Sequence, residues 1–229
     1  MQEEFAATLL LRHRQCYMEI LEVNNEEREI TLQRGEKRHV VLINPQDAVL
    51  NIKQLKDTEL KLHCVKFSEQ PSFCKINISQ EESSCRSQLY GLAVLQSKCR
   101  FDLSTHLFHN IGGGYSEQLV KFLLDDNSYG SFYGKLIIAK DAQQTEAHQT
   151  NRNILISPTA RMDTMPQLEI YADDVKASHG ATTGQLDAQA LFYMQQRGIP
   201  LSVARKMLLE AFIQDIIQDL PEELVLPLT

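Results

Sequence analysis

Short extended runs recur along most of this chain, at intervals of roughly 10 to 18 residues. They cover residues 40–43, 48–52, 59–65, 73–78, 89–95, 99–103, 119–124, 134–139, 153–157 and 167–171. No helix-length pattern separates them, whereas turn clusters occur at Asn44-Pro45, 110–114 and 125–127. Strands this frequent predict an all-β stack, which is a sandwich, a barrel or a solenoid. The turns follow no strict repeat, so periodicity alone leaves these three architectures open.

Composition narrows the class of protein. Of the 229 residues, 43% are hydrophobic and 23% are charged, as in a globular protein with a sizeable core. The formal net charge of -7 argues against nucleic acid or an anionic membrane surface as the main partner. The sequence has neither an apolar run of membrane-spanning length nor the pattern of a signal peptide, which predicts a cytoplasmic protein.

The cysteines are odd in number and have neither CxxC nor CxxxC spacing, which argues against a disulfide framework and against a zinc site. We predict that they are buried free thiols. They are Cys16, Cys64, Cys74, Cys85 and Cys99.

Helical spacing is expected at both ends of the chain. Apolar residues within 3–21 lie near a 3.6-residue period, which predicts a short N-terminal helix. After Gly184, Asp187 is expected to cap a helix that ends at Gly198, and Ser202 to cap a longer second helix. One apolar face of the second helix is predicted to consist of Val203, Met207, Leu208, Ala211, Phe212 and Ile216. Two short helices cannot bury this surface against each other, so part of it should dock on the β core or on another protein.

The segment 166–184 reads PQLEIYADDVKASHGATTG and contains two extended runs separated by Asp173-Asp174. We interpret this acidic pair, with Glu169 nearby, as a solvated turn, because adjacent strand residues point to opposite faces. The second run places Val175, Ala177 and His179 on one face. Since Gly180 permits a turn, His179 is expected at a strand end.

Together with QLDAQALFYMQQRGI and ARKMLLEAF farther on, this segment resembles the C-terminal signature of the SufB/SufD-type scaffold proteins of the SUF iron–sulfur cluster assembly system, most closely SufD. The resemblance implies a mainly β fold, with a right-handed parallel β-helix core over residues 1–184 and a small C-terminal helical region over 185–229. Known SufD chains also carry a helical domain before the β-helix, for which this chain has almost no room. A natural short form and a truncated chain both remain open.

The same resemblance implies a non-catalytic scaffold subunit of the SUF complex. It would pair through its β-helix with a SufB-like subunit, or with itself as a homodimer, and bind a SufC-like ABC ATPase through its C-terminal helices. This chain lacks a Walker A motif, so ATP hydrolysis would belong to the partner. The positions carried over for ATPase binding are Arg197, Gly198, Ile199, Val203, Met207, Leu208 and Phe212.

His179 matches the SufD histidine that is implicated in cluster assembly at the SufB interface. The SufD pattern usually has a cysteine two residues earlier, where this chain has Ala177. One imidazole cannot hold iron or a cluster alone. We therefore expect no cofactor to be bound stably by this chain alone, and an iron–sulfur cluster to be held transiently in the complex by His179 and ligands from a partner.

Two other functions are compatible with a β-solenoid. A structural homo-oligomer without assembly chemistry is favoured by Ala177. A hydrolase or transferase with His179 as general base is disfavoured, because no hexapeptide repeat and no acid/base constellation are recognisable. His106 and His109 are predicted to be structural, since their i, i+3 spacing converges on a metal only within a helix.

Overall fold

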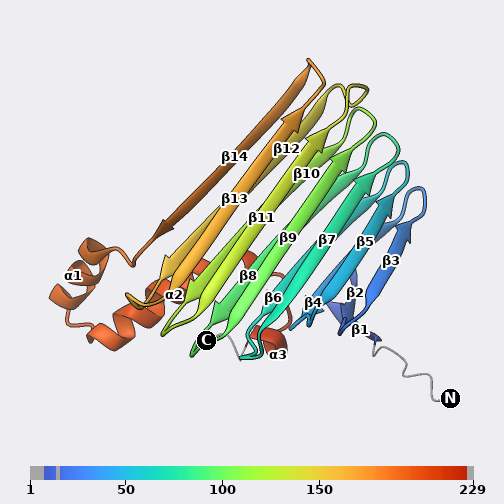
Figure 1. The fold of residues 1–229 in the computed structure, drawn as a ribbon. Helices are drawn as coiled ribbons and strands as arrows, with labels where there is room; N and C mark the ends of the chain where they lie inside the picture. Colours follow the sequence, from blue (N-terminus) through green and yellow to red (C-terminus); the bar gives the residue numbers. More distant parts are fainter. Residues whose placement is uncertain (1–7, 14–15, 226–229) are drawn as a thin grey trace.

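The computed structural model describes residues 8–13 and 16–225. From Cys16 onward, consecutive strands are added alternately to two facing β-sheets, which makes a flattened solenoid (Figure 1). The eight-stranded sheet has the order β1 (Thr8–His13), β2 (Cys16–Leu21), β4 (Lys37–Ile43), β6 (Glu59–Lys66), β8 (Arg86–Leu95), β10 (Tyr115–Leu124), β12 (Thr145–Leu155) and β14 (Val175–Gly184). The six-stranded sheet has the order β13 (Arg161–Ile170), β11 (Tyr129–Ile138), β9 (Arg100–His109), β7 (Ser72–Gln80), β5 (Ala48–Gln54) and β3 (Glu27–Leu32). The predicted mainly β solenoid with C-terminal helices is confirmed.

Alternate side chains of each inner strand point into the solenoid, and those between them point outward. In β9, every second residue from Phe101 to His109 is buried, while the residues between them are half-buried on the outer face. Inward apolar residues of both sheets form a core that includes Leu62, Leu89 and Phe132. Described neighbouring strands pair in parallel and in register, apart from the antiparallel β1–β2 pair.

Four of the five cysteines, Cys64, Cys74, Cys85 and Cys99, are buried free thiols, as predicted. The side chain of Cys16 lies outside the described part. Burial of these thiols favours the neutral form. The pKa of Cys74 is raised, first by a hydrogen bond with Cys64 and then by burial.

The predicted N-terminal helix is wrong for residues 8–13 and 16–21, which are the strands β1 and β2; its residues 3–7 and 14–15 lie outside the described part. Met18 and Ile20 pack in an apolar cluster on the outer face of the eight-stranded sheet, and β2 pairs with β4. Tertiary pairing therefore overrides the weak helical spacing.

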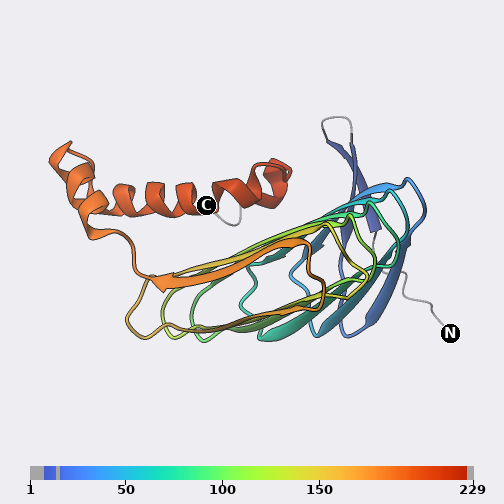
Figure 2. The same cartoon turned by 90° about the horizontal axis from the view of Figure 1, so that it is seen from above.

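Three helices follow β14: α1 (Ala188–Gln196), α2 (Leu201–Ile217) and α3 (Glu222–Val225). Asp187 caps α1 as predicted, because its Oδ1 accepts hydrogen bonds from the backbone N–H groups of Gln189 and Ala190. Gly198 follows with a φ of 82°, which favours glycine. The predicted cap of α2 is wrong, since the N-cap is Pro200 and Ser202 lies inside the helix. Figure 2 shows α2 running beside one broad face of the solenoid.

Candidate functional site

The last two strands leave the solenoid open at one end. β14 pairs with β12 only, and β13 pairs with β11 only, so the far edge of each strand has no strand partner among the described residues. We call this pair of strands the open edge. Side chains of β14 are half-buried or exposed along its whole length, whereas every second side chain of β11 is buried. Ten-residue strands with free N–H and C=O groups are able to pair with another chain.

His179 lies in the middle of β14 and not at a strand end, so that prediction is wrong. Gly180 does not turn the chain, because β14 continues to Gly184. Ala177 is in register with Ala147 and packs in a small apolar cluster at this end of the interior. His179, two residues later, lies on the same face and is exposed.

Other residues considered as ligands are dispersed. Asp173 and Asp174 form the turn between β13 and β14, as predicted, and Glu169 pairs with Lys135 at 2.8 Å. Along β9, His106 is half-buried on the outer face whereas His109 is buried inside. Within the described residues, no group of three His, Cys, Asp or Glu side chains comes together at metal-binding distance.

The predicted single apolar face of α2 is wrong, because its members divide between two sides of the helix. Ile216 is buried and Phe212 packs beside it against the eight-stranded sheet, while Val203 and Met207 are exposed. Apolar side chains of α1 and the first half of α2 form an exposed helical patch, with exposed fractions of 63% for Phe192 and 46% for Met207. The patch consists of Phe192, Tyr193, Leu201, Val203 and Met207. Of the other positions considered for partner binding, Arg197 and Gly198 are exposed beside the patch and Ile199 and Leu208 are half-buried.

Polar contacts fix the second half of α2 on the outer face of the eight-stranded sheet. Lys121 Nζ, from β10, donates to the Phe212 carbonyl at 2.6 Å and to both carboxylate oxygens of Asp215 at 2.6 and 2.7 Å. His63 Nε2 donates to the Ile216 carbonyl at 3.1 Å. The neutral His63 ring therefore presents Nδ1 as the acceptor toward His39 Nε2, at 2.9 Å.

Acid should weaken the fold through two buried histidines. Burial lowers the pKa of His63 to about 3 and that of His109 to about 4. Both values lie below the roughly 6.5 of an unfolded imidazole, so the unfolded chain binds more protons in acid. The contribution of the neutral rings to the free energy of unfolding is complete above about pH 6.5. It is lost progressively as the pH falls, down to about 4 for His109 and about 3 for His63. We expect urea unfolding to give a free energy about 3 to 4 kcal/mol lower at about pH 5 than at about pH 7.5. The variant His63→Gln/His109→Gln should lose most of this pH dependence, and an unchanged profile would contradict the assignment.

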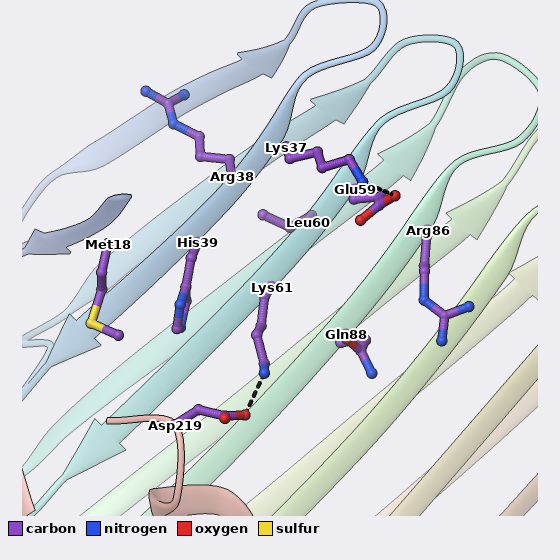
Figure 3. A pocket seen from close by; sticks show the side chains of 10 residues that line it. All are labelled: Met18, Lys37, Arg38, His39, Glu59, Leu60, Lys61, Arg86, Gln88 and Asp219. Atoms are coloured by element: carbon purple, nitrogen blue, oxygen red, sulfur yellow. Dashed lines mark hydrogen bonds and ion pairs between the residues drawn. The ribbon is translucent and has the colours of Figure 1, made fainter. Parts of the chain in front are cut away.

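A cavity of about 280 Å³ lies beside these contacts (Figure 3). Lys37 pairs there with Glu59 at 2.7 Å, and Lys61 pairs with Asp219 from the segment after α2. Because carboxylates already neutralise these cations, we interpret the cavity as the polar rim of the helix docking site. No helix in the described part of the chain combines the length and the apolar character that a membrane span requires.

Comparison with known proteins identifies the family. Residues 13–212 match the family described as "SUF system FeS cluster assembly, SufBD core domain". The chain belongs to this family, as its sequence resemblance predicted.

Relatives with curated names agree. The chain is 39% identical over 146 residues to the iron–sulfur cluster assembly protein SufD of Escherichia coli, which covers 64% of this chain and 34% of that protein. It is 34% identical over 174 residues to an iron–sulfur cluster assembly SufBD family protein of Synechocystis sp., and the match covers 76% of this chain and 38% of that protein. A chloroplastic protein of Arabidopsis thaliana, ABCI7, is 30% identical over 200 residues, and the match covers 84% of this chain and 42% of that protein. The matched region spans less than half the length of each of these relatives.

Proposed function

We propose that this chain is a non-catalytic scaffold subunit of the SUF assembly complex. Its open edge pairs with a SufB-like subunit, and its exposed helical patch binds a SufC-like ABC ATPase. The iron–sulfur cluster is cargo, held transiently where the two scaffolds meet, with His179 giving one imidazole and the partner giving the remaining ligands. The cytoplasm is the proposed location.

The position of His179 on the open edge is the observation that carries this proposal. A strand added along β14 would lie directly beside His179, because neighbouring strands are about 4.8 Å apart. Ligands from that strand would then reach the same metal as the imidazole. The dispersion of the other His, Cys, Asp and Glu side chains supports a shared site over one built by this chain alone.

The test is complementation of a strain that lacks its own SufD-type subunit. We expect His179→Ala to leave expression and complex formation intact, because the side chain is exposed, and to lower iron–sulfur maturation at least about tenfold. The matched control is His148→Ala, which removes a half-buried histidine on the outer face of β12 whose Nδ1 contacts Ser178 Oγ at 2.7 Å.

Three outcomes distinguish the hypotheses. Loss of maturation in His179→Ala alone supports the shared site. Full rescue by His179→Ala at normal expression rejects the ligand role. Self-association through the open edge, with neither a SufB-like nor a SufC-like protein bound, favours a structural homo-oligomer.

A further inference from the structure

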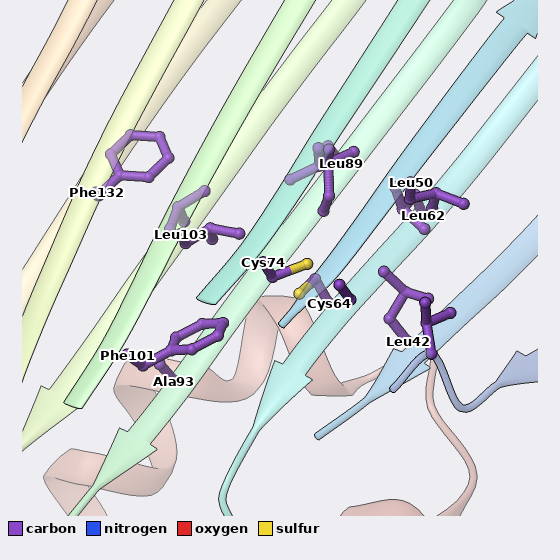
Figure 4. Close-up of a cluster of buried hydrophobic side chains, with 14 of the residues drawn as sticks. Leu42, Leu50, Leu62, Cys64, Cys74, Leu89, Ala93, Phe101, Leu103 and Phe132 are labelled. Carbon is purple, nitrogen blue, oxygen red and sulfur yellow. The ribbon is translucent and has the colours of Figure 1, made fainter. Parts of the chain in front are cut away.

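One row of inward residues changes from apolar to polar toward the open end of the solenoid. One inward row crosses the eight-stranded sheet in register through Leu62, Leu89, Gln118, Gln149 and His179. The leucines belong to the apolar core (Figure 4), whereas Gln118 and Gln149 place amides at the equivalent depth and are each 1% exposed. His179 is the last member of this row.

Hydrogen bonds orient the two amides. Thr105 Oγ1 donates to Gln118 Oε1 at 2.9 Å, and Gln149 Nε2 donates to the same oxygen at 3.3 Å. The amide nitrogen of Gln149 therefore faces β10. Its Oε1 is buried and has no hydrogen-bond partner among the described residues. A buried acceptor in this state is costly, and the neighbouring strand on the side away from β10 is β14, where His179 is in register.

The opposite sheet leaves room for this amide. Gly134 of β11 faces Gln149 across the interior, and a Cβ at position 134 would lie only 2.1 Å from Gln149 Nε2. Any side chain at this position would displace the glutamine. Gly134 therefore leaves room for the Gln149 side chain to extend across the interior from β12, the strand that pairs with β14.

We infer that Gln149 is a positioning residue for His179. Its Oε1, unpaired in this structure, is the acceptor to which one ring nitrogen of His179 would donate when the exposed imidazole turns toward the interior. That hydrogen bond would fix the tautomer and leave the second ring nitrogen unprotonated for a metal. Metal-binding histidines commonly donate their other N–H to an acceptor of this kind. The inference rests on the proposed role of His179 as a ligand, but the hydrogen bond can be measured without it.

The first test uses ¹⁵N NMR of the histidine ring nitrogens in the purified chain, at a pH where the imidazole is neutral. We expect one tautomer of His179 to dominate in the wild type and the tautomer ratio to change roughly fivefold in Gln149→Met. Gln149→Glu retains an acceptor and should retain the wild-type tautomer. The matched control is Asn151→Leu, which removes another buried amide of β12 that is in register with Ala181.

If His179 of the wild-type chain has the same tautomer ratio as histidine in a short peptide, the inference is overturned. This outcome can be measured even if Gln149→Met fails to fold. An unchanged tautomer ratio of His179 in a folded Gln149→Met variant would also overturn the inference.

Complementation then tests the positioning role. Gln149→Met should lower iron–sulfur maturation, and Gln149→Glu should restore most of it. Normal maturation in Gln149→Met, when His179→Ala abolishes it, would reject positioning. Normal maturation in His179→Ala would reject the proposed function and leave the NMR result standing.

Discussion

Met207→Asp, combined with Phe192→Ala, is expected to weaken binding of the SufC-like ATPase at least about hundredfold. Both side chains belong to the exposed helical patch, and apolar anchors at the centre of an interface commonly contribute more than 2 kcal/mol each. Their exposure in the free chain means that the substitutions should leave the fold unchanged. Calorimetric titration with the purified ATPase subunit measures the loss, and circular dichroism checks the fold.

The matched control is Gln214→Asp, which adds the same charge at an exposed position of α2 outside the patch. It should bind the ATPase nearly as well as the wild type. If the double variant keeps its affinity while circular dichroism is also unchanged, the ATPase docks elsewhere on the chain.

Ile213→Asp is expected to release α2 from the eight-stranded sheet. Ile213 is 1% exposed and packs with Val65, Leu92 and Leu123, so an aspartate there would be a buried, unpaired charge. Such substitutions are among the most destabilising, at about 4 kcal/mol or more. Hydrogen exchange of the α2 amides should accelerate at least about hundredfold, while β9 and β11 stay protected.

The solenoid should survive because its inner core is separate from the cluster that holds α2. Gln214→Asp, one residue along, again serves as the control. If the amides of all strands lose protection equally in Ile213→Asp, α2 and the solenoid do not unfold separately. If hydrogen exchange in α2 is unchanged, its polar contacts alone are enough to hold it on the sheet.

Strand positions were predictable where the interior is apolar. The runs 59–65 and 89–95 fall within β6 and β8, because their inward residues, such as Leu62 and Leu89, are apolar. The run 153–157 captured only the end of β12, whose inward residues include Gln149, Asn151 and Asn153. A polar interior removes the period-2 signal on which strand prediction depends.

The site was predictable only in part. The resemblance selected His179, but Gly180 was interpreted as a turn because glycine is common there; in an edge strand with open space around it, it is simply tolerated. The contacts of α2 gave no sequence signal. Lys121 and Asp215 are 94 residues apart, and His63 and Ile216 are 153 apart. Gln149 was missed because only the register of β12 and β14 connects it to His179.

The antiparallel β1 limits how copies of this chain can associate. Head-to-tail stacking of solenoids would require the open edge of one copy to continue both sheets of the next in parallel. Beyond β2, however, the position of the next strand is already taken by β1, which runs in the opposite direction. Parallel continuation of the eight-stranded sheet from copy to copy is therefore interrupted at this end.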